Sequence, residues 1–369
     1  MRPFPIGIDD FKKLRENNYY YADKTMFIRE LIDNRGEVSL FTRPRRFGKT
    51  LDLSMLEYYF EKAYDQDGNE EDNSFLFDGL SIMSAGEKYI RYMGQYPVIS
   101  LSLKSAKQPD FVKAYTMLKR QIADEFRRHS YVLKNLNGNS RSRFIEIMEE
   151  TRDDNQYLDA IAFLSRILKD IYKKNVIILI DEYDVPLENA YFRGFYNEMT
   201  DFIRSLFESA LKSNPNLEFA VITGCLRVTK ESIFTGLNNL EIISVLNHNY
   251  AEHFGFTQTE VEQLLADCGL QGKMQEVRQW YDGYLFGDTD VYNPWSVLNY
   301  VKTAISSPRA FPQAYWANIS SNDIVRRLVE QADGNIRQEM EELIDGGTIV
   351  KPVHEEITYD EIDKSEDNI

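Results

Sequence analysis

The sequence predicts an α/β protein with a parallel sheet between helices, followed by a mainly helical region. Two observations lead to this prediction. Short apolar runs rich in β-branched residues alternate with segments of helical spacing through the first two thirds of the 369 residues, a pattern typical of a sheet with helices on both faces. After about residue 249 helical segments dominate, for example at 259–268 and 274–281.

Strands and helices are predicted in alternation. Five apolar runs predict buried parallel strands, at residues 38–41, 97–103, 176–180, 219–223 and 242–245. Four segments with helical spacing lie among them, at 51–63, 111–126, 158–172 and 197–211. Two polar, turn-rich stretches are expected to form exposed loops, at 65–73 and 136–142.

The segment between the first strand and the first of these helices is typical of a phosphate-binding loop. A strand that turns into a helix points backbone N–H groups and the positive end of a helix dipole at one spot, where polyphosphate is stabilised. Lys49 is expected to reach the terminal phosphates, and Thr50 to place its hydroxyl on Mg²⁺. The nucleotide is therefore expected to contact Arg43, Pro44, Arg45, Arg46, Phe47, Gly48, Lys49, Thr50 and Leu51. The motif predicts a P-loop NTPase, although Arg43 replaces a glycine of the general pattern.

The strand predicted at 176–180 runs directly into two carboxylates, Asp181 and Glu182. In P-loop proteins an aspartate at this point holds the Mg²⁺ shell, which predicts that role for Asp181. The glutamate after it can orient and deprotonate the attacking water, so Glu182 is the candidate base. A strand that runs into solvent often ends in charge, but the Gly-Lys-Thr triplet upstream favours the metal site.

The next strand predicts two further groups near the γ-phosphate. Thr223 lies at its tip and could sense that phosphate, while Arg227 could neutralise charge in the transition state. Two structural alternatives stay open, in which Thr223 caps the turn at Gly224 and Arg227 pairs with a surface carboxylate. The strand at 97–103 suggests that an extra strand separates the two motif strands, which favours an ATPase over a GTPase-like switch.

We expect two domains, a P-loop domain at 1–248 and a helical, winged-helix-like domain at 249–369. Residues 348–358 alternate like the strands of a small wing. The acidic stretch after them looks cut rather than finished, so a further effector domain is expected beyond residue 369.

Composition excludes several classes of protein. A hydrophobic fraction of 43% with 13% aromatic residues excludes a mostly disordered chain. The net charge of -16 disfavours contact with nucleic acid, apart from a small basic patch at the loop arginines. The two cysteines and four histidines lack the spacing of a disulfide framework or a zinc site. No apolar run is long enough to span a bilayer, so a cytoplasmic protein with no membrane role and Mg²⁺ as its metal is expected.

Several stretches together resemble one family, the prokaryotic AAA-ATPase-like proteins. These stretches are residues 5–11, 21–25, 43–50, 180–184, 222–224, 231–239, 281–287 and 291–297, which read PIGIDDF, YADKT, RPRRFGKT, IDEYD, ITG, ESIFTGLNN, YDGYLFG and VYNPWSV. The resemblance implies that arginine at position 43 is usual and that ATP and Mg²⁺ bind at the predicted loop and acidic pair. It also implies that residues 21–25 lie near the nucleotide, which adds Asp23 and Lys24 to the candidate contacts.

Members of that family commonly carry a PD-(D/E)XK nuclease-like domain after the helical region. Its chemistry needs an Asp and an (Asp/Glu)-x-Lys on strands, so that carboxylates hold Mg²⁺ and the lysine supports the attacking water. This chain has no Glu-x-Lys, and its one Asp-x-Lys begins at Asp10, outside any predicted strand. The nuclease-like domain is therefore expected to be absent, either because the chain is a fragment or because its parent lost that domain.

Two functions are consistent with these observations. The first is Mg²⁺-dependent ATP binding with slow hydrolysis, in which the chain acts as a switch for a C-terminal, nuclease-like effector. The second is an ATP-binding scaffold that recognises protein or nucleic acid without hydrolysis. Release of phosphate in a single turnover would separate the two.

Overall fold

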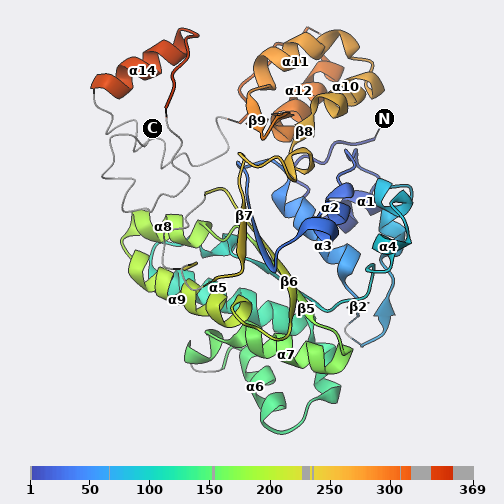
Figure 1. The fold of residues 1–369 in the computed structure, drawn as a ribbon, viewed down its shortest axis with the longest axis vertical. Coiled ribbons are helices and arrows are strands. Elements are labelled where there is room, and N and C mark those ends of the chain that lie inside the picture. Colours follow the sequence, from blue (N-terminus) through green and yellow to red (C-terminus); the bar gives the residue numbers. More distant parts are fainter. Residues whose placement is uncertain are drawn as a thin grey trace.

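A five-stranded parallel sheet lies at the centre of the computed structural model of the chain (Figure 1). The structure describes residues 2–65, 67–151, 154–226, 233–234, 237–307, 309–316 and 334–351. The strands of the sheet are β1 (Val38–Thr42), β4 (Val98–Ser102), β5 (Val176–Asp181), β6 (Leu217–Gly224) and β7 (Leu240–Ile243). Their spatial order is β4-β5-β6-β1-β7. The five predicted strands are confirmed, with ends that shift by one or two residues.

The sheet is buried on both faces, which explains why its strands are continuous apolar runs. In β5, Ile178 and Ile180 face one hydrophobic core while Ile177 and Leu179 face another. The first core lies against α5 (Phe111–Arg128), α6 (Gly138–Met148), α7 (Ala160–Tyr172), α8 (Val185–Arg193) and α9 (Tyr196–Leu211). The second lies against α1 (Phe11–Glu16), α2 (Met26–Asn34), α3 (Lys49–Phe60) and α4 (Glu87–Ile90).

One strand separates the two motif strands, as the sequence predicts. That strand is β6, which pairs in parallel with both β1 and β5. The strand that lies between the motifs in the sequence, β4, is instead at the edge of the sheet, next to β5. The carboxyl ends of β1, β5 and β6 therefore meet at one edge, where the first turn of α3 also lies.

The region after the sheet has its own hydrophobic core and lies over one end of the sheet (Figure 1). A small antiparallel sheet in the order β8-β10-β9 carries three helices. The elements are β8 (Phe256–Thr257), α10 (Gln258–Asp267), α11 (Met274–Tyr281), β9 (Tyr284–Phe286), β10 (Thr289–Tyr292) and α12 (Pro294–Ser306). A Thr257–Glu260 capping box begins α10, and Pro294 is at the start of α12, where its missing N–H costs no helical bond.

Two segments predicted as loops contain regular structure. Part of 65–73 forms β3 (Glu70–Glu71), which pairs with β2 (Ala63–Tyr64). Helix α6 begins at Gly138, inside the stretch 136–142, because the buried side chains of Phe144 and Ile147 anchor it to the first core.

Near the C-terminus, α14 (Gly334–Ile344) is the last described helix, and residues 348–351 of the expected wing form no strand, while 352–358 lie outside the described residues. Over the part of the chain that the structure describes, every helix is too short or too polar to cross a bilayer.

Candidate nucleotide site

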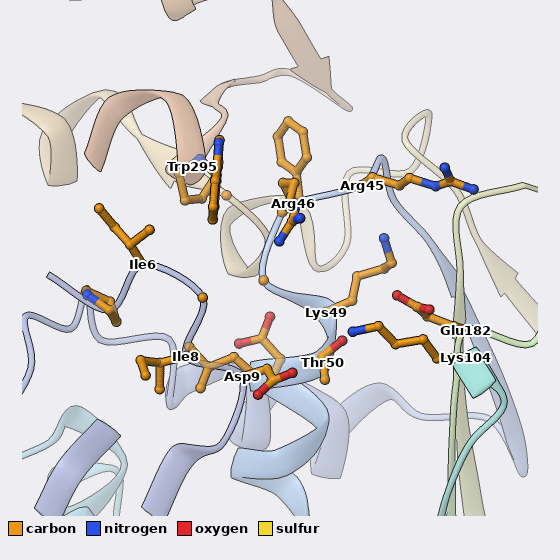
Figure 2. Close-up of a pocket in the computed structure, with 18 of the residues that line it drawn as sticks. Ile6, Ile8, Asp9, Arg45, Arg46, Lys49, Thr50, Lys104, Glu182 and Trp295 are labelled. Atoms are coloured by element: carbon orange, nitrogen blue, oxygen red, sulfur yellow. The ribbon is translucent and has the colours of Figure 1, made fainter. Parts of the chain in front are cut away.

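A cavity of about 1140 Å³ opens where the phosphate-binding loop meets the N-terminal segment and α12. Its volume is on the scale of sites that hold a ligand the size of a nucleotide. Figure 2 shows Lys49, Thr50, Lys104 and Glu182 at one side of this cavity and Ile6 and Ile8 at the other. The predicted loop residues that line it are Arg45, Arg46, Phe47, Gly48, Lys49, Thr50 and Leu51.

The loop has the backbone shape that a phosphate cradle requires. Gly48 caps α3 with a left-handed backbone (φ 92°), and Arg46 also has a positive φ, 71°. The Lys49 ammonium donates to the carbonyl oxygens of Arg43 (2.8 Å) and Pro44 (2.9 Å) and lies 3.5 Å from the sulfur of Cys225. In this arrangement the lysine is held by the loop itself, at the positive end of the helix dipole.

The predicted metal ligands Thr50 and Asp181 lie side by side at the carboxyl end of the sheet, one on α3 and the other at the end of β5. The Thr50 hydroxyl donates to Oδ2 of Asp181 at 2.7 Å, and Thr223 donates to Oδ1 of the same carboxylate. Hard oxygen atoms of this kind suit Mg²⁺, which keeps several waters and binds through one or two protein ligands plus phosphates. Within the described residues no cluster of three or more His, Cys, Asp or Glu side chains could hold a cation alone.

Glu182 points into the cavity from a strained backbone. Its φ is 53°, which is uncommon for a non-glycine residue and is often found where function requires it. Burial raises the pKa of its carboxyl, as does Asp181, while Lys104 and Lys49 oppose the shift. Lys104 begins the 3₁₀ helix η3 (Lys104–Ala106), which follows β4, and its side chain lines this end of the cavity. The end of β4 thus adds a positive charge near Glu182.

Arg43 and Pro44 do not line the cavity. The Arg43 side chain is fully buried, and its Nη1 donates to the carbonyl oxygens of Thr42 (3.0 Å) and Ile243 (2.9 Å). Its guanidinium lies 5.1 Å from the ring centroid of Phe254, and burial lowers its pKa to about 10. This placement differs from the expected phosphate contact, because Arg43 joins β1 to β7 instead of facing the loop's concave side.

The other loop side chains connect the cavity to its surroundings. Arg45 pairs with Glu188 of α8 at 2.7 Å, and the ring of Phe47 packs 4.8 Å from that of Tyr284. Gly255 approaches Phe47 so closely that a Cβ there would lie 2.8 Å from its ring. The loop is thus fixed to α8 on one side and to the small sheet on the other.

The two residues added by the family resemblance differ in position. Lys24 lines the cavity, but its ammonium is paired with Glu260 and donates to the Glu252 carbonyl at 2.7 Å. Asp23 does not line the cavity, since its carboxylate accepts from the amides of Thr25 (2.9 Å) and Ser81 (2.7 Å). Its role in the structure is to hold the start of α2. The remaining candidate, Arg227, lies outside the described residues.

The end of the cavity away from Glu182 contains residues that are not among the predicted site residues, although Tyr21 lies in the stretch that the family resemblance puts near the nucleotide. Ile6, Ile8 and Tyr21 come from the N-terminal segment, while Trp295 and Leu298 come from α12. The stretches 5–11 and 291–297 carry the family resemblance, but nothing in the sequence predicts that they meet, because more than 270 residues separate the two segments. Asp52, in the first turn of α3, is the buried carboxyl at this end, and burial raises its pKa.

Comparisons with known proteins place the chain in a family. The family described as Predicted AAA-ATPase matches residues 5–234 of the chain. A curated relative, an uncharacterized protein in the vnfD 5' region of Azotobacter chroococcum mcd 1, is 31% identical over 301 residues. The match covers 80% of this chain and 51% of the relative, so the chain spans about half the length of that protein.

The fold and the site therefore define an α/β protein with the features of a P-loop NTPase. The chain belongs to the Predicted AAA-ATPase family. Membership of this family suggests ATP binding.

Proposed function

We propose that this chain binds ATP with Mg²⁺ in the cavity and hydrolyses it slowly, acting as a nucleotide-driven switch. The observation that carries the proposal is the 2.7 Å contact between Thr50 and Asp181, which lie 131 residues apart in the sequence. To bind a magnesium triphosphate, a P-loop protein needs a loop that holds the phosphates and, beside it, a hydroxyl and a carboxylate that hold the metal.

The residues around the cavity have separate roles in this proposal. Backbone amides near Gly48 and the Lys49 ammonium bind the β- and γ-phosphates. Glu182 accepts a proton from the attacking water, and its raised pKa makes it a stronger base than an ordinary carboxylate. Mg²⁺, when bound by Thr50 and Asp181, neutralises charge on the phosphates. Thr223 positions Asp181, because its hydroxyl donates a hydrogen bond to that carboxylate.

Two variants test the proposal. Lys49→Ala is expected to lose ATP binding, while Glu182→Gln is expected to bind ATP and to lower single-turnover hydrolysis by about 100-fold. Phosphate release by the wild-type chain no faster than the background would leave the ATP-binding scaffold as the better explanation. Unchanged ATP affinity in Lys49→Ala would exclude the site itself.

The region after the sheet is the proposed transmitter of nucleotide state. A second domain is supported by the separate hydrophobic core that Phe256 forms with α10 and α12, whereas Phe254, which also follows residue 248, still packs with the core of the sheet. A winged-helix-like arrangement is supported by the order of β8, two helices and the β9–β10 hairpin. The hairpin carries Asp288 and Asp290, whose charge favours a protein partner, such as a C-terminal nuclease-like domain, over nucleic acid.

A further inference from the structure

Asp52 is a buried carboxyl whose Oδ2 atom has no hydrogen-bond partner among the described residues. Its side chain lines the cavity, only 3% of the residue is exposed, and no described residue donates a hydrogen bond to its Oδ2 atom. Buried polar atoms are nearly always hydrogen-bonded, and an orphaned one destabilises the fold. The site therefore lacks a donor that a ligand can supply.

The position of Asp52 on α3 places its carboxyl away from the metal end of the cavity. Thr50 and Asp52 are two residues apart, so their side chains project from nearly opposite sides of the helix. Thr50 contacts Asp181 at the metal end of the site. Asp52 extends back toward Gly48, with its Oδ2 atom 3.6 Å from where a Cβ of that glycine would be, and its charged neighbours are Lys24 and Glu260.

The groups that surround Asp52 already have other partners. The Lys24 ammonium is bound by Glu260 and by the Glu252 carbonyl. The hydroxyl of Tyr21 donates to the sulfur of Met55 at 3.3 Å and accepts from the Lys24 amide at 3.2 Å. These contacts use the Tyr21 proton and two of the three protons of the Lys24 ammonium, and no described residue donates to the orphaned oxygen.

The walls at this end suit a flat heterocycle. Ile6 and Ile8 lie at this end of the cavity (Figure 2), and Tyr21 and Leu298 also line the cavity. Apolar and aromatic walls with a few polar groups are typical of such sites. When phosphates occupy the amides at the start of α3, the base of the same nucleotide extends to this end. Figure 2 shows Ile6 and Ile8 across the cavity from Glu182 and Lys104.

We propose that Asp52 accepts a hydrogen bond from the exocyclic amine of a purine base and thereby sets the base preference of the site. This inference rests on the proposed function, since it takes the phosphates to lie at Lys49. The 6-amino group of adenine and the 2-amino group of guanine supply the same chemistry. A carboxyl oxygen accepts from either, whereas a base without an amine leaves the buried oxygen unpaired.

Matched nucleotides remove one amine at a time. Purine riboside triphosphate is ATP without its 6-amino group, and inosine triphosphate is GTP without its 2-amino group. The affinity of the wild-type chain for each, with Mg²⁺, is measured by calorimetry. Loss of the amine from the preferred member is expected to raise Kd by about tenfold, the effect of one hydrogen bond to a buried acceptor.

Two substitutions link that loss to Asp52. D52L removes the acceptor at similar size, so it is expected to bind ATP and purine riboside triphosphate with nearly equal affinity. D52N keeps a carbonyl acceptor and is expected to retain most of the discrimination. Thermal unfolding of D52L without nucleotide checks that the variant folds; if it does not, the nucleotide pairs on the wild-type chain still decide the matter.

Three results would overturn the inference. They are equal wild-type affinity within both matched pairs, unchanged discrimination in D52L, and a comparable loss with 2′-deoxy or 3′-deoxy ATP in place of the amine-free analogue, which would assign Asp52 to the ribose. Failure of the proposed function has a different signature, because then no magnesium nucleotide binds the wild-type chain, or Lys49→Ala binds as the wild type does.

Discussion

The guanidinium of Arg46 lies over the indole of Trp295, with 4.5 Å between the Cζ atom and the ring centroid (Figure 2). This contact joins the phosphate-binding loop to α12, which follows it by about 250 residues in the sequence. Arg46 makes it from a left-handed backbone, a conformation that persists only when neighbouring contacts hold it. The loop's shape and the position of α12 are therefore coupled.

Trp295→Ala is expected to weaken ATP binding by about two- to fivefold, because it removes a cation–π contact of about 0.5–1 kcal/mol at a partly exposed site. Calorimetric titration with Mg²⁺ and ATP measures the change. Trp280→Ala is the matched control, since Trp280 is 53% exposed and lies outside the cavity lining. Equal affinities in the two variants would show that the contact does not support the loop.

Lys104→Ala is expected to lower the rate of hydrolysis by about 10- to 100-fold while ATP affinity changes little. Lys104 lies close enough to Glu182 to oppose its rise in pKa, and a fixed cation at that end stabilises charge that develops on the γ-phosphate. Single-turnover assays separate this rate from binding. Lys113→Ala, on the exposed side of α5 and away from the cavity, should hydrolyse ATP as the wild type does.

Gly224→Ala is expected to destabilise the fold by about 1–3 kcal/mol. A Cβ at this position would lie 2.5 Å from a ring carbon of Tyr183 and 3.0 Å from Oδ1 of Asp184. Oδ2 of Asp184 accepts from the Cys225 and Leu226 amides, so the end of β6 and Thr223 would move with it. Urea denaturation measures the loss.

The control for that clash is Gly272→Ala, because a Cβ there meets nothing within 4 Å and the backbone is not left-handed. It should leave the unfolding midpoint close to that of the wild type. A Gly224→Ala protein as stable as this control would contradict the packing described at the end of β6.

The sheet and the metal end of the site follow from local sequence signals. Strands such as β5 are buried on both faces, so they need a continuous apolar run, and such runs are visible without an alignment. The positions of Thr50 and Asp181 are also set locally, one by a helix start and the other by a strand end. Parallel pairing then brings them together.

The base end of the cavity could not be found in this way. It forms when residues near the N-terminus meet α12, and neither segment carries chemistry that points to the other. From the sequence alone, Trp295 is expected to be a core residue, and only the structure shows that its ring contacts Arg46. The direction of the Arg43 side chain could not be predicted either, because the sequence does not distinguish an arginine that faces a phosphate from one that is buried against Phe254.

Glu61→Gln is expected to make stability less dependent on pH between about pH 5 and pH 8. Glu61 lies at the end of α3, where its carboxylate pairs with Arg128 of α5. Burial and the nearby Glu57 raise its pKa from 4.5 to about 7, although Arg128 opposes the shift. The folded chain thus holds this proton to a higher pH than the unfolded chain, so the wild type loses stability as pH rises through this window.

The glutamine variant cannot release a proton at this position and keeps an amide oxygen for Arg128. Its free energy of unfolding minus that of the wild type should therefore be larger at pH 8 than at pH 5, so the variant gains stability relative to the wild type as pH rises. Urea unfolding of both proteins at the two pH values measures the difference. A constant offset between the two curves would mean that Arg128 holds Glu61 ionised throughout, with the ion pair outweighing the cost of burial.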